Sequence, residues 1–148
     1  MVTARKYVLY SRGQASGEDT VNWTADTIRV ALLAVGHTPD YALHEHFDDV
    51  STDEVAASGG YTAGGEEIGT RAVNVSGDLI QLTGGNVEWD PSTIDAGYAV
   101  VYQDTGTAST SRLIGLVDFE GEQSSSDGRF AVEWDQGVVV EHDSDTSA

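Results

Sequence analysis

The sequence predicts an all-β domain, an antiparallel β-sandwich of jelly-roll-like type with a short helical insertion around residues 39–57. Short segments rich in β-branched and aromatic residues recur along the chain, and Gly, Asp, Asn or Ser closes each one. The helical crossovers of a dozen residues that a parallel βαβ arrangement needs are missing. With 148 residues, the chain is long enough for one domain with its own core. We place this single domain at residues 1–141.

The predicted strands follow one another with short connections. Residues 27–35 form a β-branched, apolar run that is typical of a buried strand. Residues 69–75 and 79–82 flank the turn sequence Ser76-Gly77-Asp78, so we expect these two segments to pair as a hairpin. The remaining predicted strands cover residues 86–89, 97–102, 112–119, 128–134 and 137–141.

Helix signals are confined to one window of the sequence. Thr38-Pro39 places a capping residue before a proline at a first helical position. Residues 51–54 have the spacing of a capping box, and Gly59-Gly60 would end the helix that follows. Residues 142–148 contain no core-forming residue and are predicted to be a flexible acidic tail.

Apolar residues on the predicted strands define the expected core. Alternation along a strand directs every second side chain to one face, and that face is buried in a sandwich. The predicted core contains Ile28, Val30, Leu32, Val73, Val100, Leu116, Phe119, Phe130 and Val132.

The charge balance is strongly acidic. The chain has 25 Asp and Glu against seven Lys and Arg, a net charge of −18, and Lys6 is its one lysine. Self-repulsion of this size destabilises a compact state in dilute buffer and is screened at molar salt. The composition therefore predicts a halophilic protein. It also argues against nucleic acid as a partner, because phosphate contacts need clustered Lys and Arg.

The composition also bears on location. The chain has no cysteine, which removes disulfides and thiolate chemistry. Its apolar runs fall well short of the roughly 20 residues that span a bilayer, and the N-terminal segment lacks the pattern of a signal peptide. We therefore expect a soluble protein that is made in the cytoplasm and has no membrane partner.

One group of side chains has the composition of a metal site: His37, Asp40, His44 and His46. A zinc enzyme needs three convergent protein ligands and an open position, and a helix would put His44 and His46 on opposite sides. The spacing thus favours solvated or capping histidines. A structural calcium or magnesium ion is a further possibility, held by Asp90 with Asp95 or by Asp118 with Glu120, and no other cofactor is expected. Those two carboxylate pairs stay open as alternatives.

Catalytic motifs are not found in the sequence. It contains no Gly-x-Ser-x-Gly elbow, its glycine pairs lack a following Lys-Ser/Thr, and close carboxylate pairs carry little information in so acidic a chain. We expect no catalytic residues and no enzyme activity. Trp23, Trp89 and Trp134 could form a glycan-stacking platform, although tryptophans of small β-domains are more often core residues.

Several motifs resemble a family of small structural proteins of tailed phages and archaeal tailed viruses. They are NWTADTIRVALL at residues 22–33, TPD at 38–40, GYTAGG at 60–65, WDPSTIDAGYAVVY at 89–102, DFEG at 118–121 and FAVEW at 130–134. The resemblance spans residues 20–141 in the same order. The departures are acidic, at Glu66, Glu67 and Glu120, as expected of a salt-adapted relative.

The resemblance implies a virion structural protein, either a capsid-surface decoration or turret protein docked on the major capsid protein or a tail or baseplate component. Such parts are symmetric homo-oligomers, here a trimer or a pentamer. A carbohydrate-binding sandwich for host glycans is the alternative from another functional class. Because molar salt screens charge pairs, apolar contact should carry assembly, and the neighbouring subunit should lie where apolar residues interrupt the surface charge.

Overall fold

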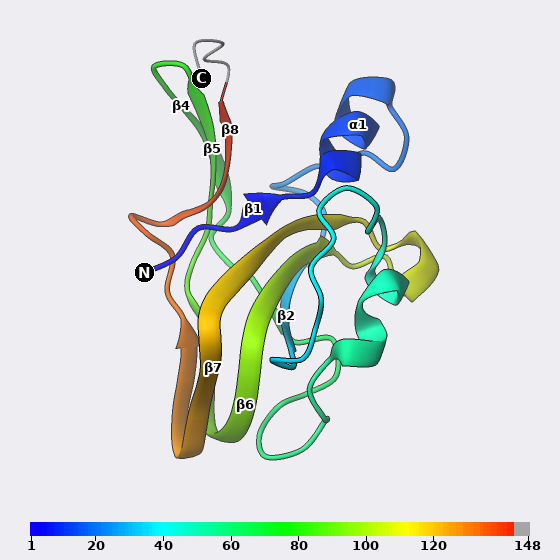
Figure 1. Ribbon diagram of the computed structural model, residues 1–148. Helices are drawn as coiled ribbons and strands as arrows, with labels where there is room; N and C mark the ends of the chain where they lie inside the picture. Colours follow the sequence, from blue (N-terminus) through cyan, green and yellow to red (C-terminus); the bar gives the residue numbers. More distant parts are fainter. Residues whose placement is uncertain (144–148) are drawn as a thin grey trace.

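Two antiparallel β-sheets pack together in the computed structural model, which describes residues 1–143, and this confirms the predicted all-β sandwich (Figure 1). The larger sheet has the strand order β1-β7-β6-β2-β3 and the smaller one β4-β5-β8. The strands of the larger sheet are β1 (Arg5–Lys6), β2 (Ile28–Leu33), β3 (Glu66–Glu67), β6 (Val87–Gln103) and β7 (Leu113–Val132). Those of the smaller sheet are β4 (Ala72–Ser76), β5 (Leu79–Thr83) and β8 (Val138–Asp143).

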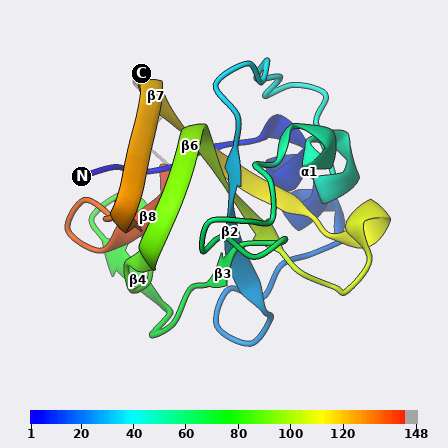
Figure 2. The ribbon, with the colours of Figure 1, turned by 90° about the horizontal axis from the view of Figure 1, so that it is seen from below.

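Strands β6 and β7 form one long bent hairpin at the centre of the larger sheet. Seen from below, β7, β6 and β2 lie side by side (Figure 2). The sequence predicted four separate strands here, and this division was wrong because β6 and β7 pair on both sides of Asp90 and also through residues 123–125. The register of the pairing shifts in these polar segments. Within the segment of β7 that shifts, Glu120 and Asp127 have positive φ angles.

Strand β2 lies between β6 and β3, and five of its six residues are buried. Burial on both faces explains why its sequence is apolar at every position except Arg29 rather than alternating. The turn before β3 passes very close to this strand. Gly65 has a φ angle of 80°, and a Cβ at this position would lie 1.7 Å from the carbonyl oxygen of Val30. Only glycine fits there.

The smaller sheet projects from the top of the molecule in Figure 1. Its β4–β5 hairpin is the predicted one, closed by a two-residue turn with Gly77 at a φ angle of 60°. The N-terminal segment joins the two sheets, because the Ala4 N–H donates to the carbonyl oxygen of Val139 at 2.8 Å and β1 pairs with β7.

The chain ends differently from the prediction. Strand β8 includes His142 and Asp143, two residues beyond the predicted domain end at 141, because they pair with Ile80 and Leu79 of β5. The rest of the predicted tail, residues 144–148, lies outside the described residues.

The helices of the chain are short. The helical insertion predicted around residues 39–57 consists of two 3₁₀ turns, Phe47–Asp49 and Ser51–Asp53. A third 3₁₀ turn lies at Ala108–Thr110. Helix α1 (Val8–Ser16) was missed. It buries only Tyr10 and Gly13, so no apolar stripe marks it in the sequence. No described helix is long and apolar enough to cross a membrane.

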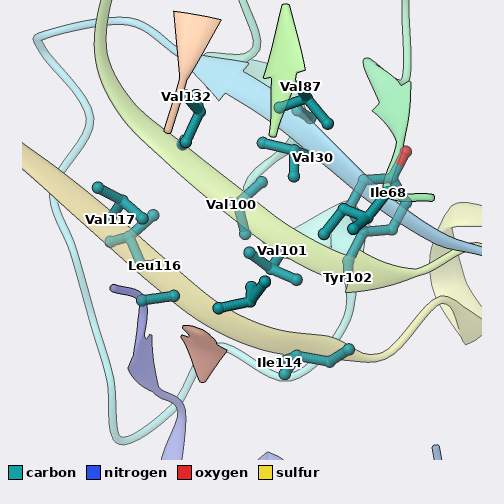
Figure 3. Packing of buried hydrophobic residues seen from close by; sticks show 14 of the residues in the cluster. Val30, Ile68, Val87, Val100, Val101, Tyr102, Ile114, Leu116, Val117 and Val132 are labelled. Atoms are coloured by element: carbon teal, nitrogen blue, oxygen red, sulfur yellow. The ribbon is translucent and has the colours of Figure 1, made fainter. Parts of the chain in front are cut away.

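Figure 3 shows part of the core, where buried side chains of β2, β6 and β7 such as Val30, Val100 and Leu116 lie close together. Its members come mainly from β2, β6, β7 and β8, and seven of the nine predicted core residues are buried. The other two differ. Val73 is 49 % exposed, because β4 is an edge strand beyond the main body, and Phe119 is only partly buried beside the irregular part of β7.

Candidate functional site

The β4–β5 hairpin carries an exposed apolar surface, which we call the β4–β5 ridge. It consists of Val73, Val75 and Ile80, which are 49 %, 78 % and 42 % exposed. Val75 pairs with Ile80 and Val73 with Leu82, so all these side chains share one face of the sheet. Leu82 is buried, and the ridge is therefore an outward continuation of the core.

The ridge lies on an unprotected sheet edge. In the described part of the chain, β4 pairs with β5 alone, so one side of its backbone has no strand partner. Residues 72–83 contain one ionisable side chain, Asp78, on a chain with a net charge of −18. Natural edge strands are normally protected by Lys, Pro or bulges. An apolar edge without such protection is a candidate surface for contact with another polypeptide.

A hydrogen bond connects α1 to β8, the strand that pairs with β5 of the β4–β5 hairpin. The Tyr10 hydroxyl lies 2.9 Å from Nε2 of His142, and the two rings meet edge to face at 5.5 Å. Burial raises the pKa of Tyr10 to about 12, so its O–H is the donor. Burial, and then the charge of Lys6, lower the pKa of His142, so its ring is the neutral acceptor.

The three tryptophans do not form a glycan platform. Trp23, Trp89 and Trp134 are at most 3 % exposed. The indole N–H groups of Trp23 and Trp134 donate to the backbone carbonyls of Thr83 and Gly85, each at 2.9 Å. Their faces pack inside the sandwich, where no sugar ring could stack on them.

The structure brings together two of the four predicted metal candidates. The rings of His37 and His44 lie 5.8 Å apart. Asp40 instead accepts the N–H groups of Ala42 and Leu43. His46 instead pairs with Asp19 at 2.9 Å. Among the described residues, no three His, Asp or Glu side chains converge on a metal position.

One member of each carboxylate pair suggested for a structural cation has a local hydrogen-bond partner. Asp118 accepts the backbone N–H of Glu120 at 2.7 Å, and Asp95 accepts the hydroxyl of Ser124 at 2.6 Å. Asp118 and Glu120 line an open groove of about 410 Å³ together with Phe119, Phe130 and Arg129. Arg129 is held there by Glu88 and Glu133. The one arginine of the groove is thus already paired with carboxylates, one of which, Glu133, also lines the groove.

A His–carboxylate pair of the kind used in catalysis does occur. Nδ1 of His37 lies 2.7 Å from Asp53, and His37 is buried. In a catalytic triad the other ring nitrogen would contact a nucleophile. Nε2 of His37 has no hydrogen-bond partner among the described residues, so no nucleophile is in place.

Sequence reasoning missed Arg112. Its side chain is 2 % exposed and pairs with Asp19 at 3.2 Å and with Glu45 at 3.4 Å. It also donates to the carbonyl oxygens of Leu9 and Glu18. Arg112 therefore fastens α1 and the loop before the first 3₁₀ turn to the start of β7. No sequence pattern could have shown this, because its partners lie 67 or more positions away.

Comparisons with known protein families, with curated proteins and with solved structures give no match. The β4–β5 ridge holds three of the seven large hydrophobic side chains that are exposed in the described part of the chain.

Proposed function

We propose that this chain is a virion structural protein, a capsid-surface decoration or turret protein that forms a homo-oligomer and docks on the major capsid protein. The observation that carries the proposal is the β4–β5 ridge, an apolar and unpaired sheet edge on an acidic chain. Exposure of Val73, Val75 and Ile80 to water is unfavourable for a monomer. In an assembly of many copies, contact with a neighbouring molecule would bury these side chains in every copy.

A second copy of the chain is the occupant that the charges favour for the ridge. Two molecules with a net charge of −18 repel each other, so they can meet only where carboxylates are sparse. The β4–β5 hairpin fits this condition, because Asp78 is its one ionisable group. Its free backbone edge adds hydrogen bonds that molar salt does not screen as it screens ion pairs.

The proposed role also fits the remaining surface. Carboxylates spread over the other strands and loops would keep the outer face of a particle hydrated in concentrated salt. Weak contacts repeated on a symmetric lattice add up to firm attachment, so no single large docking site is required. We expect a virion location, with synthesis in a halophilic host's cytoplasm.

Cryo-electron microscopy of purified virions tests the proposal. We expect density matching this fold in many copies on the capsid surface, in contact through the smaller sheet. Density restricted to the tail would replace the decoration role with that of a tail or baseplate component. If mass spectrometry of the same virions does not detect the chain, the virion role itself is wrong.

The three tryptophans proposed to contact glycans are buried, so they cannot support the alternative of a carbohydrate-binding sandwich. Nothing else in the described residues favours it over the structural role.

A further inference from the structure

Three buried polar atoms near the start of α1 have no hydrogen-bond partner in the described structure. They are the hydroxyl of Tyr7, Nε2 of His37 and Nδ1 of His44. Tyr7 is fully buried and the His37 side chain is 1 % exposed. Buried polar groups are nearly always satisfied, so three unsatisfied atoms in one place need an explanation.

The three side chains form one cluster. The ring centres of His37 and His44 are 5.8 Å apart, and those of Tyr7 and His44 are 6.4 Å apart. The turn after β2 positions His37, and the Asp40 turn positions His44, whose N–H donates to the Asp40 carbonyl. Tyr7 comes from the residue before α1. Three separate segments thus supply the unpartnered atoms.

Asp53 selects the tautomer of His37. Nδ1 lies 2.7 Å from the Asp53 carboxylate, which can only accept, so Nδ1 donates the hydrogen of the neutral ring. In that tautomer Nε2 has the lone pair, and it is buried without a hydrogen-bond partner among the described residues. A histidine that donates one N–H to a carboxylate and keeps the other nitrogen free is the arrangement that metal-binding histidines adopt.

The spacing of the two imidazoles suits a shared ion. A zinc–nitrogen bond is about 2.0 to 2.1 Å, which places the ion about 3.2 Å from each ring centre. Two such rings lie about 5.2 Å apart at a tetrahedral angle and about 6.4 Å apart when opposed. The observed 5.8 Å falls between these limits.

We propose that Nε2 of His37 and Nδ1 of His44 bind one transition-metal ion of the class that imidazole prefers, with Zn²⁺ as the reference ion. The Tyr7 hydroxyl and solvent complete its surroundings. The ion would tie the turn after β2 and the loop around residue 44 to the start of α1, as a structural staple. This site is independent of the proposed virion role.

A zinc titration of the full chain in molar KCl tests the proposal. Excess Mg²⁺ is kept present, because the many surface carboxylates take hard cations and would otherwise bind Zn²⁺ weakly. We expect Zn²⁺ at about 100 times its dissociation constant to raise the melting temperature by about 5 to 10 °C. In the ¹⁵N-labelled chain, the imidazole nitrogens of two of the four histidines should shift.

The other two histidines provide matched controls. H46A and H142A should keep the zinc-dependent stabilisation, and H44A should lose it. If H44A does not fold, the nitrogen resonances of the unaltered chain decide the question. A stabilisation that H44A retains, or zinc binding that moves no resonance of His37 and His44, would mean adventitious carboxylate binding and overturn the proposal.

Discussion

The buried side chain of Arg112 connects helix α1 and the loop around Glu45 to the start of β7. It donates to two carboxylates and to three backbone carbonyls from segments far apart in the sequence. We expect R112M to lower the free energy of unfolding by about 2 to 4 kcal/mol, because polar partners lose a charged donor. Urea unfolding in molar KCl measures this loss.

The matched control for this substitution is R129M. Arg129 also pairs with two carboxylates, Glu88 and Glu133, but on the surface of the groove. Exposed ion pairs contribute little, and salt screens them further. R129M should leave the urea midpoint unchanged. Equal losses for the two variants would show that the burial of Arg112 has no energetic consequence.

His142 makes stability depend on pH in a defined window. Burial and the nearby Lys6 lower its pKa in the folded chain, while the unfolded chain has a pKa near 6.5. The unfolded state therefore binds the proton more readily, and stability falls as pH drops below about 6.5. Melting temperatures at pH 7.5, 6.5 and 5.5 should decline more steeply for the unaltered chain than for H142Q.

In H142Q, the amide oxygen of the glutamine can still accept the hydrogen bond from the Tyr10 hydroxyl, but the side chain does not titrate. If H142Q and the unaltered chain decline in parallel, another group controls the acid sensitivity.

Two neighbouring phenylalanines show how local exposure changes a mutational cost. Phe130 is 6 % exposed and contacts the rings of Trp89 and Phe119. F130A should cost about 3 to 5 kcal/mol, the usual cost of truncating a buried aromatic side chain. F119A should cost clearly less, since Phe119 is partly buried beside the groove. Denaturant unfolding of both variants compares them, and the reverse order would contradict the burial described above.

A single charge on the β4–β5 hairpin tests whether the β4–β5 ridge is the contact surface of the proposed homo-oligomer. V75K places a charge at the most exposed position of the ridge and leaves the core untouched. We expect its melting temperature to stay within about 2 °C of the unaltered chain, while the oligomer dissociates to monomers. Sedimentation velocity in molar KCl measures the change in mass.

L43K is the control for the hairpin variant. Leu43 is 73 % exposed but lies away from the ridge, in the loop after β2. It should leave the oligomer intact. Dissociation by L43K and not by V75K would move the interface to that loop.

The elements also show what sequence could and could not predict. Turn chemistry and alternation identified the β4–β5 hairpin, because both signals are local. The same local rules ended the predicted strand before Asp90, whereas β6 continues because it pairs with β7 on both sides of this residue. Helix α1 escaped detection because tertiary contacts of Tyr10 and Arg112 hold it in place rather than an amphipathic pattern.

The histidine cluster was only half predictable for the same reason. Spacing placed His37, His44 and His46 in one window, but the fold turns His46 toward Asp19 and brings in Tyr7 from another segment. A single sequence cannot show which of several nearby histidines face one another.

For the whole molecule, the net charge predicts a stability that depends on salt. Repulsion among 25 acidic side chains opposes the compact state, and the Debye length falls from about 10 Å at 0.1 M salt to about 3 Å at 1 M. The melting temperature should therefore rise steadily between 0.1 M and 2 M KCl. Calorimetry checks this, and a melting temperature indifferent to KCl would contradict a salt-adapted surface.

The N-terminal segment between the two sheets has a consequence for how the chain is made. The Thr3 hydroxyl donates to Val138, 135 residues away, and Val2 and Ala4 bond to Glu133 and Val139. These first residues leave the ribosome long before their partners exist. The contacts of this segment with the smaller sheet must therefore form after β8 has been synthesised, so they belong to the last stage of folding of a nascent chain.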